Sequence, residues 1–288
     1  MVLLERIDLW LELTKARLSL LVLMTTAIGF WLGMRSADQW LGLILTCVGT
    51  ALVVGGANAL NQWMEQAPDA LMRRTQHRPL PTGRLSAEAA FRFGAALSAL
   101  GMIWLAIAVN MLSATLAAVS WATYVLVYTP LKRRTPLCTL VGAVPGALPP
   151  VIGWAGARNS LGEGAWALFA ILFVWQLPHF LALAVLYRTD YERAGFPMLP
   201  LIETDGRLTA RQILLYGAVL LPLSLFPTML GVAGPVYFYG AMALGCGFFL
   251  LAARAAWSYS LDSARQLFQA SVVYLPVLLG LLAIDRTR

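Results

Sequence analysis

Uncharged, mostly apolar runs alternate with short charged segments along the whole chain. The runs cover residues 18–34, 39–64, 93–131, 135–157, 164–187, 212–253 and 266–284. A helix needs roughly 20 apolar residues to cross a bilayer, and most of these runs are close to that length. The pattern therefore predicts membrane-spanning helices.

Two of the runs are too long for one crossing. Residues 93–131 and 212–253 would each form a helix of about 60 Å at about 1.5 Å per residue, roughly twice the hydrocarbon thickness. Asn110 interrupts the first run, and Gly231, Gly234 and Pro235 interrupt the second. We therefore predict an all-α fold, a polytopic bundle of nine transmembrane helices that forms a single domain over residues 1–288.

The composition agrees with this pattern. Hydrophobic residues make up 59% of the chain and charged residues 12%, whereas soluble domains carry about 25% charged residues. Soluble, disordered and disulfide-stapled secreted classes are excluded by so much unbroken apolar sequence.

The positions of the basic residues predict the orientation. Of the 21 Lys and Arg residues, 17 lie before the first span or in the loops around residues 63–92, 131–134, 187–211 and 254–265. Because short cytoplasmic loops are enriched in basic residues, we expect the N-terminus in the cytoplasm and the C-terminus on the opposite side. A net charge of +7 then reflects a basic face suited to membrane lipid or an anionic substrate, and not to nucleic acid.

Residues 1–17 are too charged to span a membrane. Leu3, Leu4, Ile7, Trp10 and Leu11 share one helical side, which predicts an interfacial helix. The acidic residues of this segment argue against a mitochondrial transit sequence. We expect a multi-pass protein of a bacterial cytoplasmic (inner) membrane.

The first long cytoplasmic segment, residues 63–87, follows a ladder of polar residues. Asn61, Glu65 and Asp69 recur every four residues, so a helix continuing from the second span would place them on one face. Pro68 is expected to bend this helix before Asp69.

The second long segment, residues 187–211, again mixes acids and bases, with Asp190 and Glu192 among arginines. Residues 82–86 resemble residues 205–209 at an offset of 123, and each string contains a Ser or Thr suited to a helix N-cap. The same offset places Asp69 opposite Glu192, close to Asp190. We therefore expect the two acidic segments to be related.

Carboxylate and amide oxygens are the ligands that Mg²⁺ prefers, commonly together with substrate phosphates. Arg and Lys add charge-assisted hydrogen bonds to phosphate. This chemistry at the mouth of an apolar bundle suits a substrate with a diphosphate head and a lipid tail. The alternative is that these are ordinary solvated loops, and the regular ladder and its matching second segment favour the site.

At these residues, and over nearly its whole length, the chain resembles the UbiA superfamily of intramembrane prenyltransferases. Three strings resemble its protohaem IX farnesyltransferase (haem O synthase) branch in particular. They are Arg74-Thr75-x-x-Arg78-Pro79-Leu80, Pro178-His179-Phe180, and Asp190-Tyr191-x-x-Ala194-Gly195-x-Pro197-Met198-Leu199-Pro200. Further similar strings are Lys15-Ala16-Arg17, Tyr128-Thr129-Pro130-Leu131-Lys132-Arg133, and the segments 146–154 and 175–176.

The resemblance implies transfer of a farnesyl group from farnesyl diphosphate to the 2-vinyl group of haem B, with addition of water, to give haem O. It implies Mg²⁺ as cofactor, and haem A synthase as a candidate partner. The implied catalytic residues are Asn61, Glu65, Asp69, Asp190 and Lys132. The implied substrate-binding residues are Arg73, Arg74, Arg78, Arg133, Tyr128, Tyr191 and His179. The implied metal ligands are Asn61, Glu65, Asp69 and Asp190, with Glu192 added because Ala194 stands where a further carboxylate is common.

His179 has two readings. An ionisable residue within a span marks a functional site, which for this family means haem, either as axial ligand to iron or as partner to a propionate. The structural reading is an interhelical hydrogen bond near the backbone gap left by Pro178.

Two other functions stay open at this point. One is a related prenyltransferase acting on an aromatic quinone precursor or a chlorin. The other is a membrane transporter, although transporters place their coupling charges near the bilayer midplane, and these charges lie at one surface.

Overall fold

The computed structural model describes residues 2–287, without the side chains of residues 2–7 and 37, and it is almost entirely helical in this range. Nine segments of the described chain are long and apolar enough to cross a membrane, which confirms the predicted number. They are α2 (Ala16–Gly33), α3 (Trp40–Met64), α5 (Ala87–Ala108), the continuous span of α6 (Met111–Ala122), η2 (Thr123–Tyr128) and α7 (Thr129–Leu131), α8 to α9 (Cys138–Arg158), α10 (Glu163–Leu186), α13 (Arg207–Met229), α14 (Pro235–Ser258) and α15 (Leu261–Ile284). The shorter helices are α1 (Val2–Leu13), η1 (Ala37–Gln39), α4 (Gln66–Leu71), α11 (Arg188–Arg193) and α12 (Leu199–Ile202).

Both long apolar runs fold back where the sequence predicts. Asn110 caps α6, because its side-chain oxygen accepts a hydrogen bond from the Ser113 backbone N–H at 2.8 Å. In the second run, Gly231 adopts a φ of +66°, which suits a residue without a Cβ, and Pro235 opens α14 at its first turn. These two turns therefore divide the two long apolar runs into four of the nine spans.

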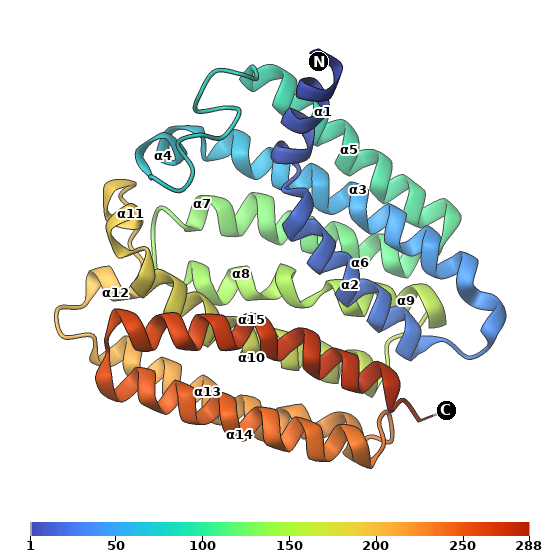
Figure 1. Ribbon diagram of the computed structural model, residues 1–288. Coiled ribbons are helices and arrows are strands. Elements are labelled where there is room, and N and C mark those ends of the chain that lie inside the picture. The colour runs from blue at the N-terminus through green and yellow to red at the C-terminus, as the bar shows by residue number, and fades with distance from the viewer. Residues whose placement is uncertain (1, 288) are drawn as a thin grey trace.

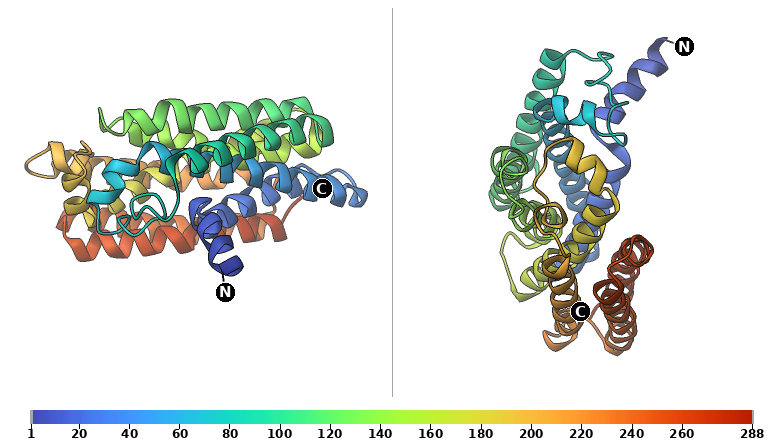
Figure 2. Two further views of the ribbon diagram at one scale, coloured as in Figure 1. Left: turned by 90° about the horizontal axis from the view of Figure 1, so that it is seen from above. Right: turned by 90° about the vertical axis from the view of Figure 1, so that its left-hand side faces the viewer.

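The helices form two groups joined by the fifth span (Figure 1, Figure 2). In the N-terminal group α3 packs on α2 and α5, and α5 packs on α6. In the C-terminal group α13 packs on α10 and α14, and α15 packs on α10 and α14. The fifth span contacts both groups, because α9 (Pro149–Arg158) lies against α2 and α6 while α8 (Cys138–Ala147) lies against α10.

Close backbone contact holds the fifth span against α2. A Cβ at Gly29 would lie 2.0 Å from the Pro150 carbonyl oxygen, and one at Gly153 would lie 1.9 Å from that of Thr26. Glycines on both helices therefore permit an approach that any side chain would block, as is common between membrane helices.

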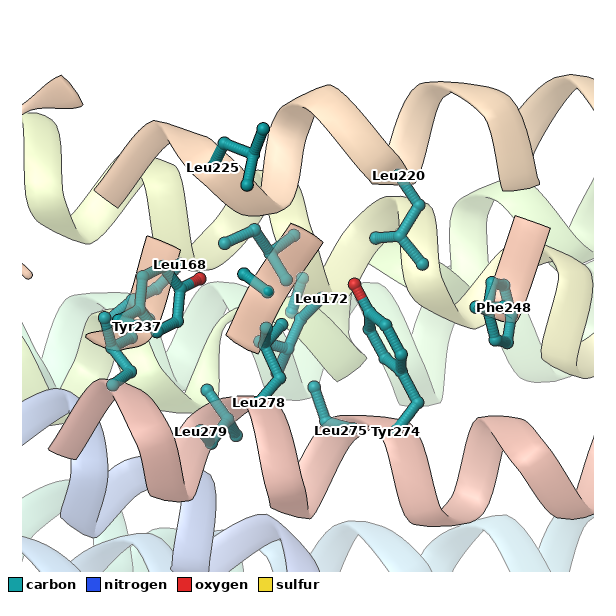
Figure 3. Packing of buried hydrophobic residues seen from close by; sticks show 14 of the residues in the cluster. Leu168, Leu172, Leu220, Leu225, Tyr237, Phe248, Tyr274, Leu275, Leu278 and Leu279 are labelled. Atoms are coloured by element: carbon teal, nitrogen blue, oxygen red, sulfur yellow. The ribbon is translucent and has the colours of Figure 1, made fainter. Parts of the chain in front are cut away.

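The core of the C-terminal group contains side chains of α10, α13, α14 and α15 (Figure 3). Leu168 and Leu172 of α10, Leu220 of α13 and Leu278 of α15 belong to one buried cluster. The Tyr237 hydroxyl of α14 donates to the backbone carbonyl of Ser224 at 2.6 Å, so its polar atom is satisfied inside the core. In a lipid environment such packing stabilises the bundle mainly through van der Waals contact.

The two ends of the bundle differ. Helices α4, α7, α11 and α12 gather at one end, and the C-terminus lies at the other (Figure 1). There a C-terminal strap, residues 285–287, ties several helix ends together. The Asp285 carboxylate accepts a hydrogen bond from the Tyr237 backbone N–H at 2.7 Å, at the start of α14, and the Arg286 guanidinium donates to the carbonyls of Trp31 and Met34 at the end of α2. Which end faces the cytoplasm remains the prediction made from the basic residues.

Helix α1 runs across the direction of the spans (Figure 1, Figure 2). Trp10 packs on Phe93 with ring centroids 4.4 Å apart, Leu13 is fully buried, and Leu11 is exposed. Part of the predicted apolar side of α1 therefore packs on α5 and does not face the membrane interface. The side chains of Leu3, Leu4 and Ile7 lie outside the described ones, and the interfacial role of this helix stays a prediction.

Candidate active site

The polar ladder after the second span is broken at one residue. Helix α3 ends at Met64 and α4 begins at Gln66. Pro68 accounts for the break, because proline has no N–H for the carbonyl four residues earlier and its ring clashes with that carbonyl. The Met64 carbonyl accepts a hydrogen bond from the Arg133 guanidinium at 2.8 Å instead. The expected bend before Asp69 is therefore confirmed, and it explains the position of exposed Arg133.

Asn61, Glu65 and Asp69 remain in successive turns, and they are 2%, 2% and 1% exposed. The Asn61 side-chain oxygen accepts a hydrogen bond from the Lys15 ammonium at 2.9 Å, and its amide nitrogen donates to the Thr129 hydroxyl at 3.1 Å. The sequence interpretation did not place Lys15 or Thr129 in the site. Both residues lie in strings that resemble the family, Lys15 before the first span and Thr129 at the end of the fourth, and this resemblance was the one sequence signal that could have indicated them.

Lys15 is strongly perturbed by its position. It has a φ of 50° between α1 and α2, and its side chain reaches across to α3. Burial, and then the nearby positive charge of Arg78, lower the pKa of Lys15 to about 7. Arg78 and Lys132 lower the pKa of Lys15, whereas Glu65 and Asp69 raise it, so Lys15 senses the charges of the whole cluster.

Glu65 pairs with Lys132, which follows the fourth span. Both carboxylate oxygens accept a hydrogen bond from the Lys132 ammonium at 3.1 Å. The ammonium also lies 4.8 Å from the centroid of the Phe196 ring, a favourable cation–π distance. Burial alone would lower the pKa of Lys132, but the Glu65 carboxylate raises it above its ordinary value. Phe196 is a further site residue that the sequence interpretation did not single out.

Asp69 is held on one side only. Its Oδ2 atom pairs with the Arg78 guanidinium at 2.6 Å, and its backbone carbonyl accepts a hydrogen bond from the Thr75 hydroxyl at 2.8 Å. Its Oδ1 atom is sealed from solvent and has no hydrogen-bond partner among the described residues. An unpaired buried carboxylate oxygen is costly. This atom therefore marks the place where a ligand would be bound most favourably.

Asp190 brings the second segment to the first. It lies in α11, is buried, and accepts hydrogen bonds from the backbone N–H groups of Arg73 and Arg74 at 3.2 and 3.4 Å. The contact joins residues 117 positions apart, immediately after α4. The two acidic segments therefore contact each other in the structure.

The weak repeat is reproduced in part. Gly83 and Gly206 share a left-handed backbone, with φ of 71° and 70°. Ser86 caps α5 as predicted, but the prediction for Thr209 is wrong, because Thr209 lies inside the first turn of α13. The Glu203 carboxylate accepts hydrogen bonds from two backbone N–H groups of that turn and replaces the predicted cap.

Arg74 lies between aromatic rings beside this cluster. Its guanidinium carbon is 4.8 Å from the Tyr187 ring centroid and 5.6 Å from that of Tyr191, and its guanidinium donates to the Tyr191 hydroxyl at 3.4 Å. Tyr191 itself is buried, whereas Arg73 and Arg74 are both exposed. Both arginines contact Asp190 through their backbone N–H groups, and Arg74 also contacts Tyr187 and Tyr191 through its guanidinium.

Of the three other predicted residues, Tyr128 lies beside Lys132, whereas Glu192 and His179 form no hydrogen bond with the buried carboxylates of the described chain. Glu192 is exposed and lines a surface pocket with Arg188 and Ile202. Tyr128 is half-buried and stacks on Tyr124, with its ring centroid 5.9 Å from the Lys132 ammonium. His179 lies on α10, where Nδ1 is 2.7 Å from the Ser271 hydroxyl of α15, so the interhelical contact of the structural reading is present.

The oxygen atoms of Asn61, Glu65 and Asp69 are of the kind that Mg²⁺ prefers. Among the described residues no group of three or more His, Cys, Asp or Glu side chains is close enough to hold one ion. Mg²⁺ commonly takes one or two carboxylates and completes its shell with water and substrate phosphates. The sealed Oδ1 of Asp69 and the neighbouring carboxylate and amide oxygens fit a site in which one or two carboxylates bind Mg²⁺ together with water and substrate phosphates.

Comparison with known proteins shows which family the chain resembles. The UbiA prenyltransferase family model matches residues 22–275. A protoheme IX farnesyltransferase of Solibacter usitatus is 48% identical over 96% of this chain and 98% of its own length, and one of Koribacter versatilis is 44% identical over 96% and 92%. Both sequence similarities extend over nearly the whole protein.

Solved structures share the fold. One, described as giving insights into the biosynthesis of digeranylgeranylglyceryl phosphate synthase in membranes, has a TM-score of 0.83 at 16% identity and covers 98% of both chains. A UbiA homolog from Archaeoglobus fulgidus, bound to GPP and Mg²⁺, has a TM-score of 0.70 at 16% identity and covers 95% of this chain and 99% of its own.

The nine apolar spans of the described chain and its bacterial relatives identify a multi-pass protein of the bacterial inner membrane. The match to a family of prenyltransferases excludes the transporter alternative. The chain belongs to the UbiA prenyltransferase family, in the branch of the protoheme IX farnesyltransferases.

Proposed function

We propose that the protein transfers the farnesyl group of farnesyl diphosphate to the 2-vinyl group of haem B, giving haem O and diphosphate. The observation that carries the site is Asp69: its sealed Oδ1 atom has no partner among the described residues, and Arg78 and Lys132 lie at the carboxylate cluster. The names of the relatives, protoheme IX farnesyltransferases, support haem as the acceptor. The catalytic segments are residues 63–87 and 187–211 of a single domain.

The carboxylate cluster is proposed to hold Mg²⁺ with the diphosphate. Asn61, Glu65, Asp69 and Asp190 would supply oxygen ligands, and Glu192, on the exposed side of α11, would supply at most an outer contact. When bound, Mg²⁺ neutralises the negative charge that develops on the diphosphate as it leaves. The GPP- and Mg²⁺-bound relative from Archaeoglobus fulgidus supports this cofactor.

The basic residues have separate proposed tasks. Arg74, Arg78 and Lys132 lie at the cluster and would donate charge-assisted hydrogen bonds to diphosphate oxygens. Arg73 and Arg133 are exposed and would guide the anionic substrate to the mouth of the bundle. Their guanidinium groups remain charged at any physiological pH.

The reaction itself breaks the bond between farnesyl C1 and the bridging diphosphate oxygen, and the electron pair leaves with diphosphate. The vinyl carbon then attacks the allylic cation, and water adds to the resulting cation with loss of a proton. The ring of Tyr128, near Lys132, and the ring of Tyr191, near Arg74, would stabilise the allylic cation through their faces. The apolar bundle excludes bulk water during this step.

The deciding experiment incubates the purified full chain in detergent with farnesyl diphosphate, Mg²⁺ and haem B, followed by mass analysis of the porphyrin products. Farnesylated, hydrated haem supports the proposal. 4-Hydroxybenzoate and a chlorin serve as competing acceptors. Prenylation of either of them, with haem B unchanged, would replace haem as the acceptor. A partnership with haem A synthase stays a prediction, which copurification of the two proteins would test.

A further inference from the structure

His179 has a ring nitrogen that the proposed farnesyl transfer does not use. The residue lies in α10, seven residues before the helix ends, or about 10 Å along its axis. Its Nδ1 atom is 2.7 Å from the Ser271 hydroxyl of α15. That hydroxyl is also 2.6 Å from the backbone carbonyl of Phe268 on the same helix. The three groups form one hydrogen-bonded chain.

The positions of the protons in this chain follow from the donors available. Ser271 has one hydroxyl proton, and two oxygens 2.6 Å apart require a proton between them. The hydroxyl therefore donates to the Phe268 carbonyl and must accept from His179. It follows that His179 carries its proton on Nδ1, which leaves a lone pair on Nε2.

Nε2 is open to its surroundings. No described residue forms a hydrogen bond with it. Unlike Asp69 Oδ1, it is not one of the fully buried atoms of the described chain that lack a partner. A neutral imidazole whose Nδ1–H is fixed by an acceptor, and whose Nε2 is open, is the usual form of a metal-ligating histidine.

The surroundings limit which metal this nitrogen can serve. Structural and catalytic zinc sites need three or four protein ligands, and no group of three His, Cys, Asp or Glu side chains is close enough in the described residues. A haem iron needs no such group, because the porphyrin supplies four nitrogens and the protein needs to supply one axial ligand. A propionate contact is disfavoured, since Nε2 has no proton to donate.

Flat aromatic side chains surround the ring. Trp175 stacks on His179 at 5.1 Å with an interplanar angle of 25°, and the Phe268 and Phe180 rings lie at 4.9 and 5.3 Å. The Trp175 indole N–H donates to the Ser271 backbone carbonyl at 2.9 Å, which fixes α10 against α15 at the same residue. These contacts hold the imidazole in an apolar setting between α10 and α15.

We propose that Nε2 of His179 is the axial ligand of the haem B iron, and that Ser271 positions the imidazole for it. This inference rests on the proposed function, in which haem B is the acceptor. Since α10 leads directly into α11 with Asp190, His179 lies 11 residues before that carboxylate, about three helical turns along the chain. Ser271 is a positioning residue, because it acts through His179.

The test is a titration of the purified full chain in detergent with ferric haem B, without farnesyl diphosphate, read by the Soret absorption band. His179→Ala should lose the ligated spectrum and bind haem B more than about 10-fold more weakly. Ser271→Ala should keep the spectrum and weaken binding by about 10-fold, the usual effect of removing such a partner. His77→Ala, which removes the exposed histidine of the first loop, is the matched control and should change neither.

Two further measurements separate ligation from packing. Metal-free protoporphyrin IX should bind His179→Ala and the unmodified protein equally well, and imidazole should restore the ligated spectrum to His179→Gly. A wild-type haem B affinity and spectrum in His179→Ala would overturn the inference, as would an equal loss for protoporphyrin IX. If the unmodified protein farnesylates haem B while His179→Ala keeps the ligated spectrum, the ligation fails and the proposed function stands. If the unmodified protein binds no haem B, both fail.

Discussion

Replacing Lys132 by Met tests the central ion pair of the site. The Lys132 ammonium lies 3.1 Å from both Glu65 carboxylate oxygens, and the two side chains are 12% and 3% exposed. Methionine keeps the apolar stem beside Phe196 but removes the charge. Glu65 would then be a buried carboxylate without its partner.

The expected cost follows from that geometry. Two unit charges about 3 Å apart attract each other by about 5 kcal/mol at an effective dielectric constant of roughly 20. Breaking one partner out of a buried pair typically destabilises a protein by about 3–5 kcal/mol. We expect Lys132→Met to fall in that range. The double variant Glu65→Gln, Lys132→Met should recover most of the loss, because no unpaired charge remains buried.

The assay is denaturant unfolding of the purified protein in one detergent, followed by circular dichroism, with the slope compared among variants. Arg92→Met is the matched control, because it breaks an ion pair with Glu88 on the exposed surface of α5 and should cost less than about 0.5 kcal/mol. A Lys132→Met variant no less stable than Arg92→Met would refute a buried, fully charged pair. So would a double variant as unstable as the single one.

Three further outcomes are expected. Asp69→Ala should abolish haem B farnesylation while the protein still elutes as a folded species in detergent, and turnover near the wild-type rate would contradict the role of its open oxygen. Chelation of Mg²⁺ should stop turnover and added Mg²⁺ should restore it, whereas full activity after exhaustive chelation would remove the metal from the proposal. Asp190→Asn should raise KM for farnesyl diphosphate, because asparagine replaces one acceptor oxygen of the Arg73 and Arg74 contacts by a donor. Losing such a contact costs about 1–3 kcal/mol. An unchanged KM would show that this contact does not shape the site.

Local sequence signals predicted most of the fold. Asn110, Gly231 and Pro235 interrupt helices through their own backbone chemistry, so the two longest apolar runs could be divided without knowledge of the tertiary structure. Pro68 likewise predicted the break after α3. Thr209 was misjudged because a carboxylate six residues earlier competes for the same N–H groups.

Contacts between distant segments limited the prediction of the site. The ladder revealed Asn61, Glu65 and Asp69, but the partners of Asn61 come from α7 and from the start of α2. No periodicity in the sequence indicates that Lys15 reaches across 46 residues to α3. The tautomer of His179 depends on Ser271, whose position on α15 is a property of helix packing alone.

The C-terminal strap has a consequence for assembly in the cell. Residues 285–287 follow the ninth span, so the ribosome makes them after every helix that they join. Until then the first N–H groups of α14 and the last carbonyls of α2 lack these partners. Insertion of all nine spans is therefore complete before the end opposite the polar site can close, and a nonsense mutation before Asp285 would leave that end open in an otherwise fully inserted protein.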